Sequence, residues 1–427
     1  MIIHVVKEGD TIESIAEAYG VPASQIIREN EITNADNLLP GQDLVIQYTA
    51  VTHTVAPGDT LYSIAELYNV SVIHILQNNP GLSNATTLYP GQTIVIDYNN
   101  EKIGSLSVTG YAYPYINRET LIKTLPYLTY LTIFTYGFTP TGELVTIDDV
   151  STINLAREYG VAPIMLISTL TPEGTFSNAL AHTLLNNETV QDTLIDNIIT
   201  NMQEKNYYGL DVDFEFIYPE DADAYVAFIN KLRERLNAVG FEVMVALAPK
   251  ISSDQPGTLY EGHDYAALGA AANSVLLMTY EWGYTYGPPM AVAPINKVRE
   301  VLDYGVSQIP ASKIFMGIPN YGYDWTLPYV KGTSAAKSLG NVAAVDLALE
   351  YNAPIQFDTT SQAPFFNYTD ADGKEHQVWF EDARSIEAKI RLVPEYGFQG
   401  AAYWNIMRYF PANWLVVNAL MDINKVL

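Results

Sequence analysis

The segment "YYGLDVDFEFIYPED", residues 207–221, carries acids at the alternate positions 211, 213 and 215 of a largely apolar run. Successive side chains of a β-strand point to opposite faces, so Asp211, Asp213 and Glu215 share one face and the apolar residues between them share the other. A solvated strand edge is an alternative, but the aromatic and aliphatic residues on both sides favour burial. The segment therefore predicts a strand that packs its apolar face on helices and turns its acids toward a partly enclosed space.

The chain around this segment predicts an α/β fold, a (β/α)8 or TIM barrel. From about residue 106 onward, apolar strand-like runs alternate with helical patterns, and this order favours a parallel sheet. Eight such units in roughly 320 residues favour a closed barrel, with catalysis at the C-terminal strand ends. The expected strands are residues 106–113, 130–138, 162–168, 210–216, 242–248, 274–280, 314–319 and 400–405, and the expected helices include 188–205, 221–239, 295–304 and 383–396. Val212, Phe214 and Phe216 are expected to pack on the helices.

The interval between the seventh and eighth expected strands is long enough to hold an insertion, which we place at about residues 327–382. Within it, "APFFNYTDADGKEHQVWFED" (363–382) has aromatic runs on either side of Asp372-Gly373, a strong signal for a hairpin turn. We therefore expect a small α+β insertion that forms one wall of the cleft beside the site.

The first hundred residues contain a repeat. "HVVKEGDTIESIAEAYGVPASQIIREN" (4–30) reappears as "HTVAPGDTLYSIAELYNVSVIHILQNN" (53–79), and each copy is followed by a Pro-Gly-Gln turn and an apolar strand. Thr11 and Thr60 fit helix N-caps. The repeat predicts two β-α-α-β modules, at residues 1–48 and 51–98, then a short polar linker and a barrel domain at 104–427.

Both copies resemble LysM modules, through G-D-[ST]-[IL]-x-x-I-A-x-x-[YF], a central Asn and the PGQ turn. The resemblance implies binding to glycans that contain N-acetylglucosamine, such as peptidoglycan or chitin, through the loop after the first strand and the loop before the last. The residues to which it assigns this role are Gly9, Asp10, Thr11 and Asn30 in the first copy and Gly58, Asp59, Thr60 and Asn79 in the second. The alternative is that Gly, Asp and Thr only form the turn and cap the helix.

Composition excludes several classes of function. Lys and Arg total 22 against 48 Asp and Glu, a net charge of -26, so nucleic acid would be repelled. The chain has no Cys, which rules out disulfides and thiolate chemistry. No stretch has the apolar length of a membrane span, and the N-terminal residues lack the pattern of a signal peptide. The 31 Tyr and 5 Trp suit a protein that stacks sugar rings on aromatic faces, although most of them are expected in the core.

Three carboxyl groups in one small space cannot all ionise easily. Alternate acids on a strand stand about 6–7 Å apart, so at least one pKa must rise, as a general acid requires near neutral pH. An EF-hand calcium loop starting at Asp211 is excluded, because it needs Gly at its sixth position and Glu at its twelfth, where this chain has Phe216 and Ala222. A Mg²⁺ or Mn²⁺ site remains an alternative, since oxygen ligands suit these ions. The six His show no ligand spacing, and we expect neither a metal nor a cofactor.

The segment "GLDVDFEF" (209–216) resembles the G-x-D-x-D-x-E signature of family 18 glycoside hydrolases, the chitinase-like enzymes. Three further matches fall at expected strand ends: "MTYEW" (278–282), "MGIPNYG" (316–322) and "GAAYW" (400–404). With two LysM repeats in front, the whole architecture resembles the spore-cortex-lytic N-acetylglucosaminidases, or germination glycosylases, of spore-forming bacteria.

The family resemblance implies a retaining mechanism in which the acetamido oxygen of the substrate attacks the anomeric carbon, outside the usual two-carboxylate scheme. It implies that Glu215 is the general acid and then the general base. Asp213 would hold the acetamido N–H, Asp211 would share charge or a proton with Asp213, and Tyr280 would donate a hydrogen bond to the acetamido oxygen.

The same resemblance implies that Trp404 forms the floor under the sugar at the cleavage site. Tyr321, Tyr136 and Trp282 are further cleft candidates, with core packing as the alternative for each. Glu281, also expected to bind substrate, stands where the family usually has Asp.

A second departure lies just before the motif glycine. Tyr208 stands there, where many members have Asp, so a supporting carboxylate is missing.

These features predict an N-acetylglucosaminidase acting on peptidoglycan, at the bacterial cell wall or spore surface, with the LysM repeats tethering a monomer to the polymer. A chitinase that uses the same residues is one alternative. A non-catalytic glycan-binding spore-coat protein is another.

Overall fold

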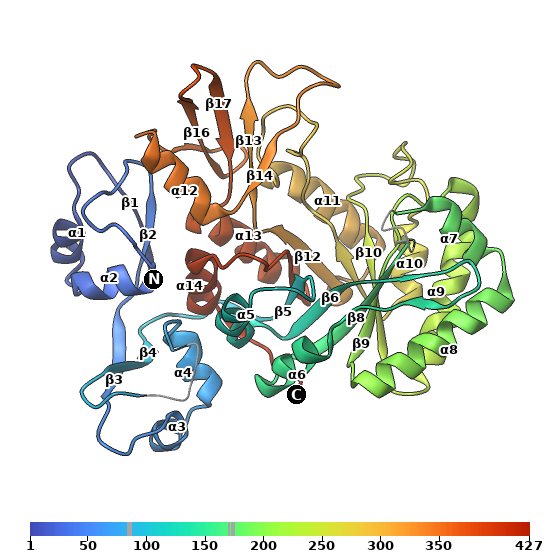
Figure 1. Cartoon of the computed structure of the whole chain (residues 1–427), viewed down its shortest axis with the longest axis horizontal. Coiled ribbons are helices and arrows are strands. Elements are labelled where there is room, and N and C mark those ends of the chain that lie inside the picture. Colours follow the sequence, from blue (N-terminus) through green and yellow to red (C-terminus); the bar gives the residue numbers. More distant parts are fainter. Residues whose placement is uncertain (83–87, 170, 172–175) are drawn as a thin grey trace.

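The acid-rich segment begins as strand β9 (Gly209–Asp213) of a closed barrel. The computed structural model describes residues 1–82, 88–169, 171 and 176–427, and within these ranges eight parallel strands form the barrel. The ring closes because β5 pairs in parallel with both β18 and β6 (Figure 1). Its strands are β5 (Gly104–Ala112), β6 (Tyr130–Phe138), β8 (Ala162–Ser168), β9, β10 (Glu242–Leu247), β11 (Ser274–Leu277), β12 (Ile314–Pro319) and β18 (Gly400–Trp404). The predicted TIM barrel and its eight strands are confirmed.

Helices follow the strands and cover the outside of the barrel (Figure 1). They are α5 (Arg118–Thr124), α6 (Val150–Glu158), α7 (Asn178–Leu185), α8 (Glu188–Lys205), α9 (Ala222–Asn237), α10 (Tyr265–Ala271), α11 (Ile295–Gln308), α13 (Ala383–Tyr396) and α14 (Pro411–Leu420). Short 3₁₀ turns are η1 (Leu125–Tyr127), η2 (Pro219–Asp221) and η3 (Ala311–Lys313), and small strands β7 (Leu144–Val145) and β19 (Met421–Ile423) extend the sheet. The bounds expected for α8 and α13 agree with the structure.

The barrel has an outer core between strands and helices and an inner core in its centre. Val212 and Phe214 are fully buried in the outer core, as expected from their side of the strand. The expectation for Phe216 is wrong, because its side chain is 43% exposed. Strand β9 ends at Asp213, and the backbone of Phe216 turns into the left-handed region with φ 57°, so the two-residue alternation no longer holds there.

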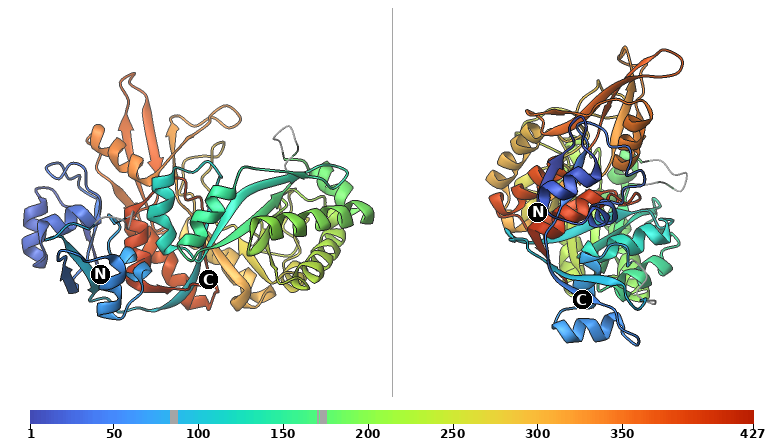
Figure 2. Two further views of the ribbon diagram at one scale, coloured as in Figure 1. Left: turned by 60° about the horizontal axis from the view of Figure 1, so that its bottom comes forward. Right: turned by 90° about the vertical axis from the view of Figure 1, so that its left-hand side faces the viewer.

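The insertion between β12 and β18 is the predicted α+β unit, and it stands away from the barrel in both views of Figure 2. All of its residues are described, and they form a sheet in the order β14-β13-β17-β16-β15 together with helix α12. The elements are β13 (Gly322–Thr326), β14 (Lys337–Leu339), α12 (Asn341–Glu350), β15 (Gln356–Asp358), β16 (Ala363–Thr369) and β17 (Glu375–Trp379). The expected hairpin is β16–β17, and Gly373 supplies the positive φ (78°) in its turn.

The two N-terminal repeats each fold as β-α-α-β, as predicted. The first contains β1 (Ile2–Val5), α1 (Ile12–Tyr19), α2 (Ala23–Glu29) and β2 (Asp43–Ile46), and the second contains β3 (Thr49–Thr54), α3 (Leu61–Tyr68), α4 (Val72–Asn78) and β4 (Thr93–Tyr98). In each module the first and last strands pair antiparallel. Thr11 and Thr60 are N-caps, each in a capping box with the Ser three residues later.

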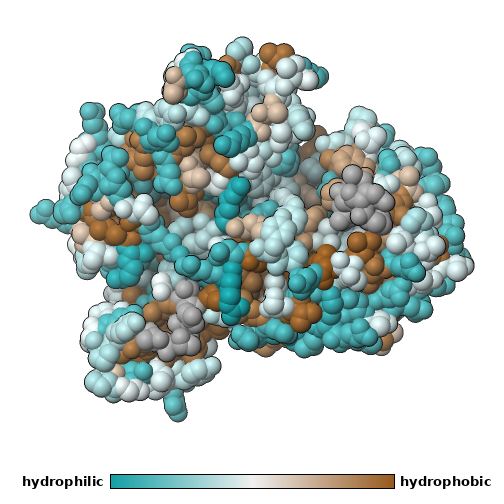
Figure 3. Space-filling view, viewed as in Figure 1, coloured by the Kyte–Doolittle hydropathy of each residue, from teal (hydrophilic) through white to brown (hydrophobic). Residues whose placement is uncertain are grey.

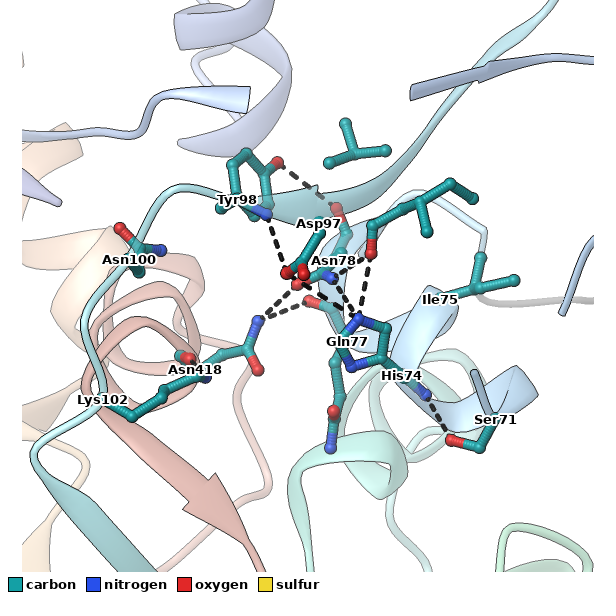
Figure 4. Close-up of polar contacts among 12 residues, drawn as sticks. Ser71, His74, Ile75, Gln77, Asn78, Asp97, Tyr98, Asn100, Lys102 and Asn418 are labelled. Atoms are coloured by element: carbon teal, nitrogen blue, oxygen red, sulfur yellow. Dashed lines mark hydrogen bonds and ion pairs between the residues drawn. The ribbon is translucent and has the colours of Figure 1, made fainter. Parts of the chain in front are cut away.

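The two modules are docked on the rest of the chain by hydrogen bonds. Figure 4 shows the second module, where the side chain of Asn418, on α14, donates to Oδ1 of Asn78 (2.9 Å). In the first module, Lys123 forms an ion pair with Glu31 (2.6 Å). The segment 98–104, expected to be a polar linker, is also fixed, because Lys102 donates to the carbonyl of Asn418. The modules are therefore held against the barrel rather than joined to it by a free linker.

Hydrophilic residues gather over the outer side of the helices at the right of the view in Figure 3, in keeping with the strong net negative charge. Among the described residues, no helix combines the length and apolar character needed to cross a bilayer.

Candidate active site

The acids stand where β9 leaves the barrel toward its C-terminal face. Asp211 is fully buried, whereas Asp213 and Glu215 are partly exposed. Tyr280 follows β11 by three residues and Trp404 ends β18, so strand ends on different sides of the barrel converge on one site. The structure thus brings together Asp213, Glu215, Tyr280 and Trp404, which line one pocket.

Asp211 is held from below by a residue of another strand. The hydroxyl of Tyr111, on β5, donates to Oδ2 of Asp211 at 2.5 Å. Burial raises the pKa of Asp211 to about 6, although the bond from Tyr111 acts in the opposite direction. Oδ1 of Asp211 is buried and has no hydrogen-bond partner within the described parts of the chain. This oxygen is available to a proton shared with a neighbour.

Asp213 and Glu215 have raised pKa values for different reasons. The pKa of Asp213 lies well above its usual range because of burial, and then because of the negative charges of Glu215 and Asp211. The pKa of Glu215 is raised first by burial and then by Glu281. Oδ1 of Asp213 is also buried without a partner among the described residues. A buried, unsatisfied acceptor that lines a pocket is suited to a donor from a ligand.

Two pockets meet above Trp404. The acid pocket, about 270 Å³, is lined by Asp213, Glu215, Tyr280, Phe134 and Tyr260, among others. The side pocket, about 440 Å³, is lined by Tyr115, Asn320, Tyr321, Tyr323, Ser338 and Arg408, among others. Tyr113, Glu281 and Trp404 line both pockets. Together they form one cleft, and the indole of Trp404 packs edge-on against Phe134 at 5.0 Å between ring centroids.

Glu281 connects the barrel to the insertion. Its Oε1 accepts hydrogen bonds from the hydroxyls of Tyr321 and Tyr323, the latter at 3.0 Å. Burial raises the pKa of Glu281, while the two Tyr hydroxyls oppose this effect. Glu281, which stands where the family usually has Asp, is therefore held between the two pockets by Tyr residues at the base of the insertion. Tyr321, also predicted, lines the side pocket.

Two predicted cleft residues lie elsewhere. The prediction for Tyr136 is wrong, because its side chain is fully buried in the outer core, where its hydroxyl donates to Asp149 and accepts from Lys205 (2.7 Å). The bulge between Ile133 and Tyr136 in the pairing with β8 changes the register at this point. Trp282 packs against the outer core and is not among the described residues lining either pocket.

Tyr208 lies at the opposite end of the barrel from the acids. Its ring is 6.0 Å from that of Tyr130, and it lines a small cavity of about 20 Å³ with the first residues of several strands. Tyr208 therefore fills the N-terminal end of the barrel. Its replacement of the usual Asp does not touch the groups around Glu215.

Sequence reasoning missed His263, which fixes the backbone between the acids. Nδ1 of His263 accepts the N–H of Ala248 (3.0 Å), so Nε2 carries the proton that is donated to the carbonyl of Phe214 (2.9 Å). Burial lowers the pKa of His263 to about 4, which keeps it neutral in this role. Local spacing gave no signal for it, because His263 is far from Phe214 in the chain. Tyr111 and Tyr323 were missed for the same reason.

In the LysM modules, the predicted residues carry out structural tasks. The amide groups of Asn30 and Asn79 bond the backbone of the adjacent helix and of the last strand, for example the carbonyl of Val45 (2.9 Å) and that of Val95 (2.6 Å). Their donors and acceptors are thus used within the fold, and the expectation that these two Asn bind glycan is not supported. Asp10 and Asp59 each accept from a His, at 3.0 and 2.8 Å, and Gly9 and Gly58 have positive φ in the turn.

Over the described residues, no group of three or more His, Asp or Glu side chains has the geometry of a metal site. The cleft offers acids, hydroxyls and aromatic faces. This chemistry suits proton transfer to and from a sugar.

Comparison with known proteins identifies the family. The model of "Glycosyl hydrolases family 18" matches residues 108–408, which include every barrel residue named in the cleft. The chain belongs to glycosyl hydrolase family 18. It is therefore a glycoside hydrolase, and the LysM domain model matches residues 4–47 and 53–97.

Some relatives align with this chain over its full length. The "Cortical fragment-lytic enzyme" of Bacillus subtilis (strain 168) is 41% identical and the alignment covers 100% of this chain and 99% of that protein. The crystal structure of the Bacillus megaterium QM B1551 spore cortex-lytic enzyme SleL matches with a TM-score of 0.84 and 41% identity, over 100% and 99% of the two chains. A chitinase from Chromobacterium violaceum ATCC 12472 matches 74% of this chain and 99% of its own, with a TM-score of 0.69 and 28% identity.

Proposed function

We propose that this protein is an N-acetylglucosaminidase that hydrolyses the β-1,4 bond after N-acetylglucosamine in peptidoglycan, in spore cortex or its fragments, by a retaining, substrate-assisted mechanism. The observation that carries the proposal is the buried Oδ1 of Asp213 beside Glu215 in the acid pocket, which has no hydrogen-bond partner among the residues that the structure describes. The similarity to proteins named for cortical fragments and spore cortex supports the choice of polymer.

In this mechanism the sugar to be cleaved lies on Trp404 with its acetamido group toward Asp213. Glu215 gives its proton to the glycosidic oxygen as the bond from the anomeric carbon breaks, and the acetamido oxygen bonds to that carbon. Asp213 accepts the acetamido N–H and stabilises the positive oxazolinium ion. Water then attacks the anomeric carbon, the bond from that carbon to the acetamido oxygen breaks, and Glu215 takes a proton from the water. The configuration at the anomeric carbon is inverted twice and therefore retained.

Asp211 and Tyr280 act around this step. Asp211 is buried, has a pKa raised to about 6 and lies on the same strand as Asp213. In this proposal the two carboxyl groups share one proton, which lets Asp213 exchange its contact with Asp211 for one with the acetamido N–H. Tyr280 stays protonated, since burial and the nearby acids raise its pKa well above the usual value. Its hydroxyl is therefore a donor for the acetamido oxygen as charge develops.

The LysM modules have a separate task in this proposal. They bind the same polymer through the exposed turns at Gly9, Asp10 and Thr11 and at Gly58, Asp59 and Thr60, and this keeps the barrel near its bonds. Such binding would place the protein at the cell wall or spore surface.

The experiment is product analysis with two proteins, the wild type and Glu215→Gln. Wild type should release fragments from cortex peptidoglycan that end in reducing N-acetylglucosamine. Glu215→Gln should still be pulled down by insoluble peptidoglycan but release almost nothing, because only the acid is lost. If the variant retained full hydrolysis, Glu215 would not be the general acid.

A chitinase is the second candidate, favoured by the similarity to the Chromobacterium violaceum chitinase over the barrel. It would use the same acids. Release of chito-oligosaccharides from chitin, with no products from cortex fragments, would select it. Binding to peptidoglycan without products from either polymer would instead indicate a non-catalytic glycan-binding protein.

A further inference from the structure

The lining of the side pocket includes one basic residue that the reaction does not use, Arg408. Among the described residues lining the two pockets, Arg408 is the one base, beside the acids Asp213, Glu215 and Glu281. Its side chain is exposed, and within the described parts of the chain it has no ion pair and no side-chain hydrogen bond. Its donors are therefore available to a ligand that enters the side pocket.

The surroundings of Arg408 hold it in place. Its backbone carbonyl accepts a hydrogen bond from Nδ2 of Asn320 (2.9 Å), and Asn320 is itself buried, with 7% of its surface exposed. Its side-chain stem lies over Gly340, where an added Cβ would stand 2.8 Å from Cδ of Arg408. The barrel and the insertion thus both shape the position of this side chain.

The place of the side pocket along the sugar chain follows from its lining. Neither Asp213 nor Glu215 lines it, and it meets the acid pocket above Trp404. Glu215 must stand beside the bond that breaks, at the anomeric carbon of the sugar on Trp404. The side pocket then receives the next sugar on the other side, which is joined to the 4-oxygen. In a polymer that alternates N-acetylglucosamine with muramic acid, cleavage after N-acetylglucosamine puts muramic acid in this pocket.

We propose that the side pocket binds a carboxylate-bearing amino sugar and that Arg408 pairs with its carboxylate. Arg is well suited to this task, because its planar fork can donate two parallel hydrogen bonds to one carboxylate. The inference rests on the proposed function, and it assigns to Arg408 the distinction between peptidoglycan and chitin, whose sugars carry no carboxylate. The carboxylate can be the lactyl group of muramic acid or the end of a short stem peptide.

The test compares wild type with Arg408→Gln on defined oligosaccharides of equal length. The substrates are an N-acetylglucosamine–muramic acid oligomer, the same oligomer with a stem peptide, the oligomer with its carboxylates methyl-esterified, and a chito-oligosaccharide. Lys374→Gln is the matched control, because it removes one positive charge from the exposed β16–β17 turn, outside the described lining of both pockets.

Arg408→Gln should reduce kcat/KM on the acidic oligomer by about tenfold, mainly by raising KM, since the contact is far from the bond that breaks. The same variant should leave kcat/KM on the chito-oligosaccharide and on the esterified oligomer unchanged. Arg408→Lys should recover part of the loss on the acidic oligomer. A loss only with the stem peptide would place the recognised carboxylate on the peptide.

Equal effects of Arg408→Gln on the acidic and neutral substrates, or no effect on either, would overturn the inference. These outcomes are separate from failure of the proposed function, which would appear in the wild type as cleavage of chito-oligosaccharides alone.

Discussion

Tyr111 and Asp211 face each other across the inside of the barrel, joined by a 2.5 Å hydrogen bond from the hydroxyl to Oδ2. The bond stabilises the ionised carboxylate, whereas burial favours the protonated one, so Tyr111 keeps the pKa of Asp211 from rising beyond about 6. In the proposed mechanism, Tyr111 therefore influences the proton that Asp211 shares with Asp213, although Tyr111 does not line either pocket among the described residues.

Tyr111→Phe should move the acidic limb of the pH profile. Without the hydrogen bond the pKa of Asp211 rises, so the pair holds its second proton to higher pH. We expect the acidic limb of kcat/KM to shift upward by about one pH unit, the size of one hydrogen bond to a charged group. An unchanged acidic limb, with activity otherwise normal, would show that Asp211 does not take part in the proton transfer.

Much of this arrangement follows from the sequence. Alternation at Asp211 and Asp213 predicted a strand with acids on one side, and the Gly9 and Gly58 repeats predicted two modules. The exposure of Phe216 was not predicted, because side chains alternate only while the backbone stays in the sheet, and β9 ends at Asp213. Tyr136 was misplaced because a bulge changes the register of β6, and a bulge leaves no clear mark in the residues.

Contacts between distant parts of the chain are a second limit. The bond of Tyr111 to Asp211 joins residues 100 positions apart, and those of His263 connect other separate segments. The pattern of residues within a short stretch of sequence carries no information on pairs of residues that are far apart in the chain. The docking of the modules was missed in the same way, since the polar residues around Lys102 suggested a linker.

Asp211→Asn should alter stability as a function of pH. The folded pKa of Asp211 is about 6, above its value near 4 in an unfolded chain, so the unfolded state binds fewer protons between these values. Ionisation of Asp211 should therefore lower the free energy of unfolding by up to ~3 kcal/mol as pH rises from about 4 to about 6. Asp211→Asn should lose less stability over this range in urea unfolding, with the exposed Asp372→Asn as control. Parallel curves for wild type and Asp211→Asn would contradict the prediction.

Glu281→Gln should move the basic limb of the pH profile of kcat/KM to lower pH. The negative charge of Glu281 helps to raise the pKa of Glu215, and the amide removes that charge while it can still accept from Tyr321 and Tyr323. A lower pKa means that Glu215 loses its proton at lower pH, so kcat/KM on a soluble fragment should begin to fall at lower pH than in wild type. A basic limb that stays in place would show that Glu281 does not influence the acid.

Gly41→Ala should disturb the docking of the first module. A Cβ on Gly41 would stand 1.8 Å from the carbonyl oxygen of Ile355 in the insertion. Gly9→Ala is the matched control, because Gly9 has nearly the same φ (87° against 88°) but nothing within 4 Å of its Cβ position. Both variants carry the backbone cost of about 1–2 kcal/mol, and only Gly41→Ala adds a clash. We expect a larger fall in thermal midpoint and faster proteolysis for Gly41→Ala than for Gly9→Ala, and equal behaviour of the two would contradict the docked arrangement.

The most direct test of the central claim is mass spectrometry of the products that wild type forms from purified cortex fragments in water enriched in oxygen-18. The proposed mechanism predicts one heavy oxygen on the anomeric carbon of a reducing-end N-acetylglucosamine, and no labelled product with Glu215→Gln. Label on the anomeric carbon of muramic acid would contradict the proposed bond, and label released by Glu215→Gln at the wild-type rate would contradict the proposed acid.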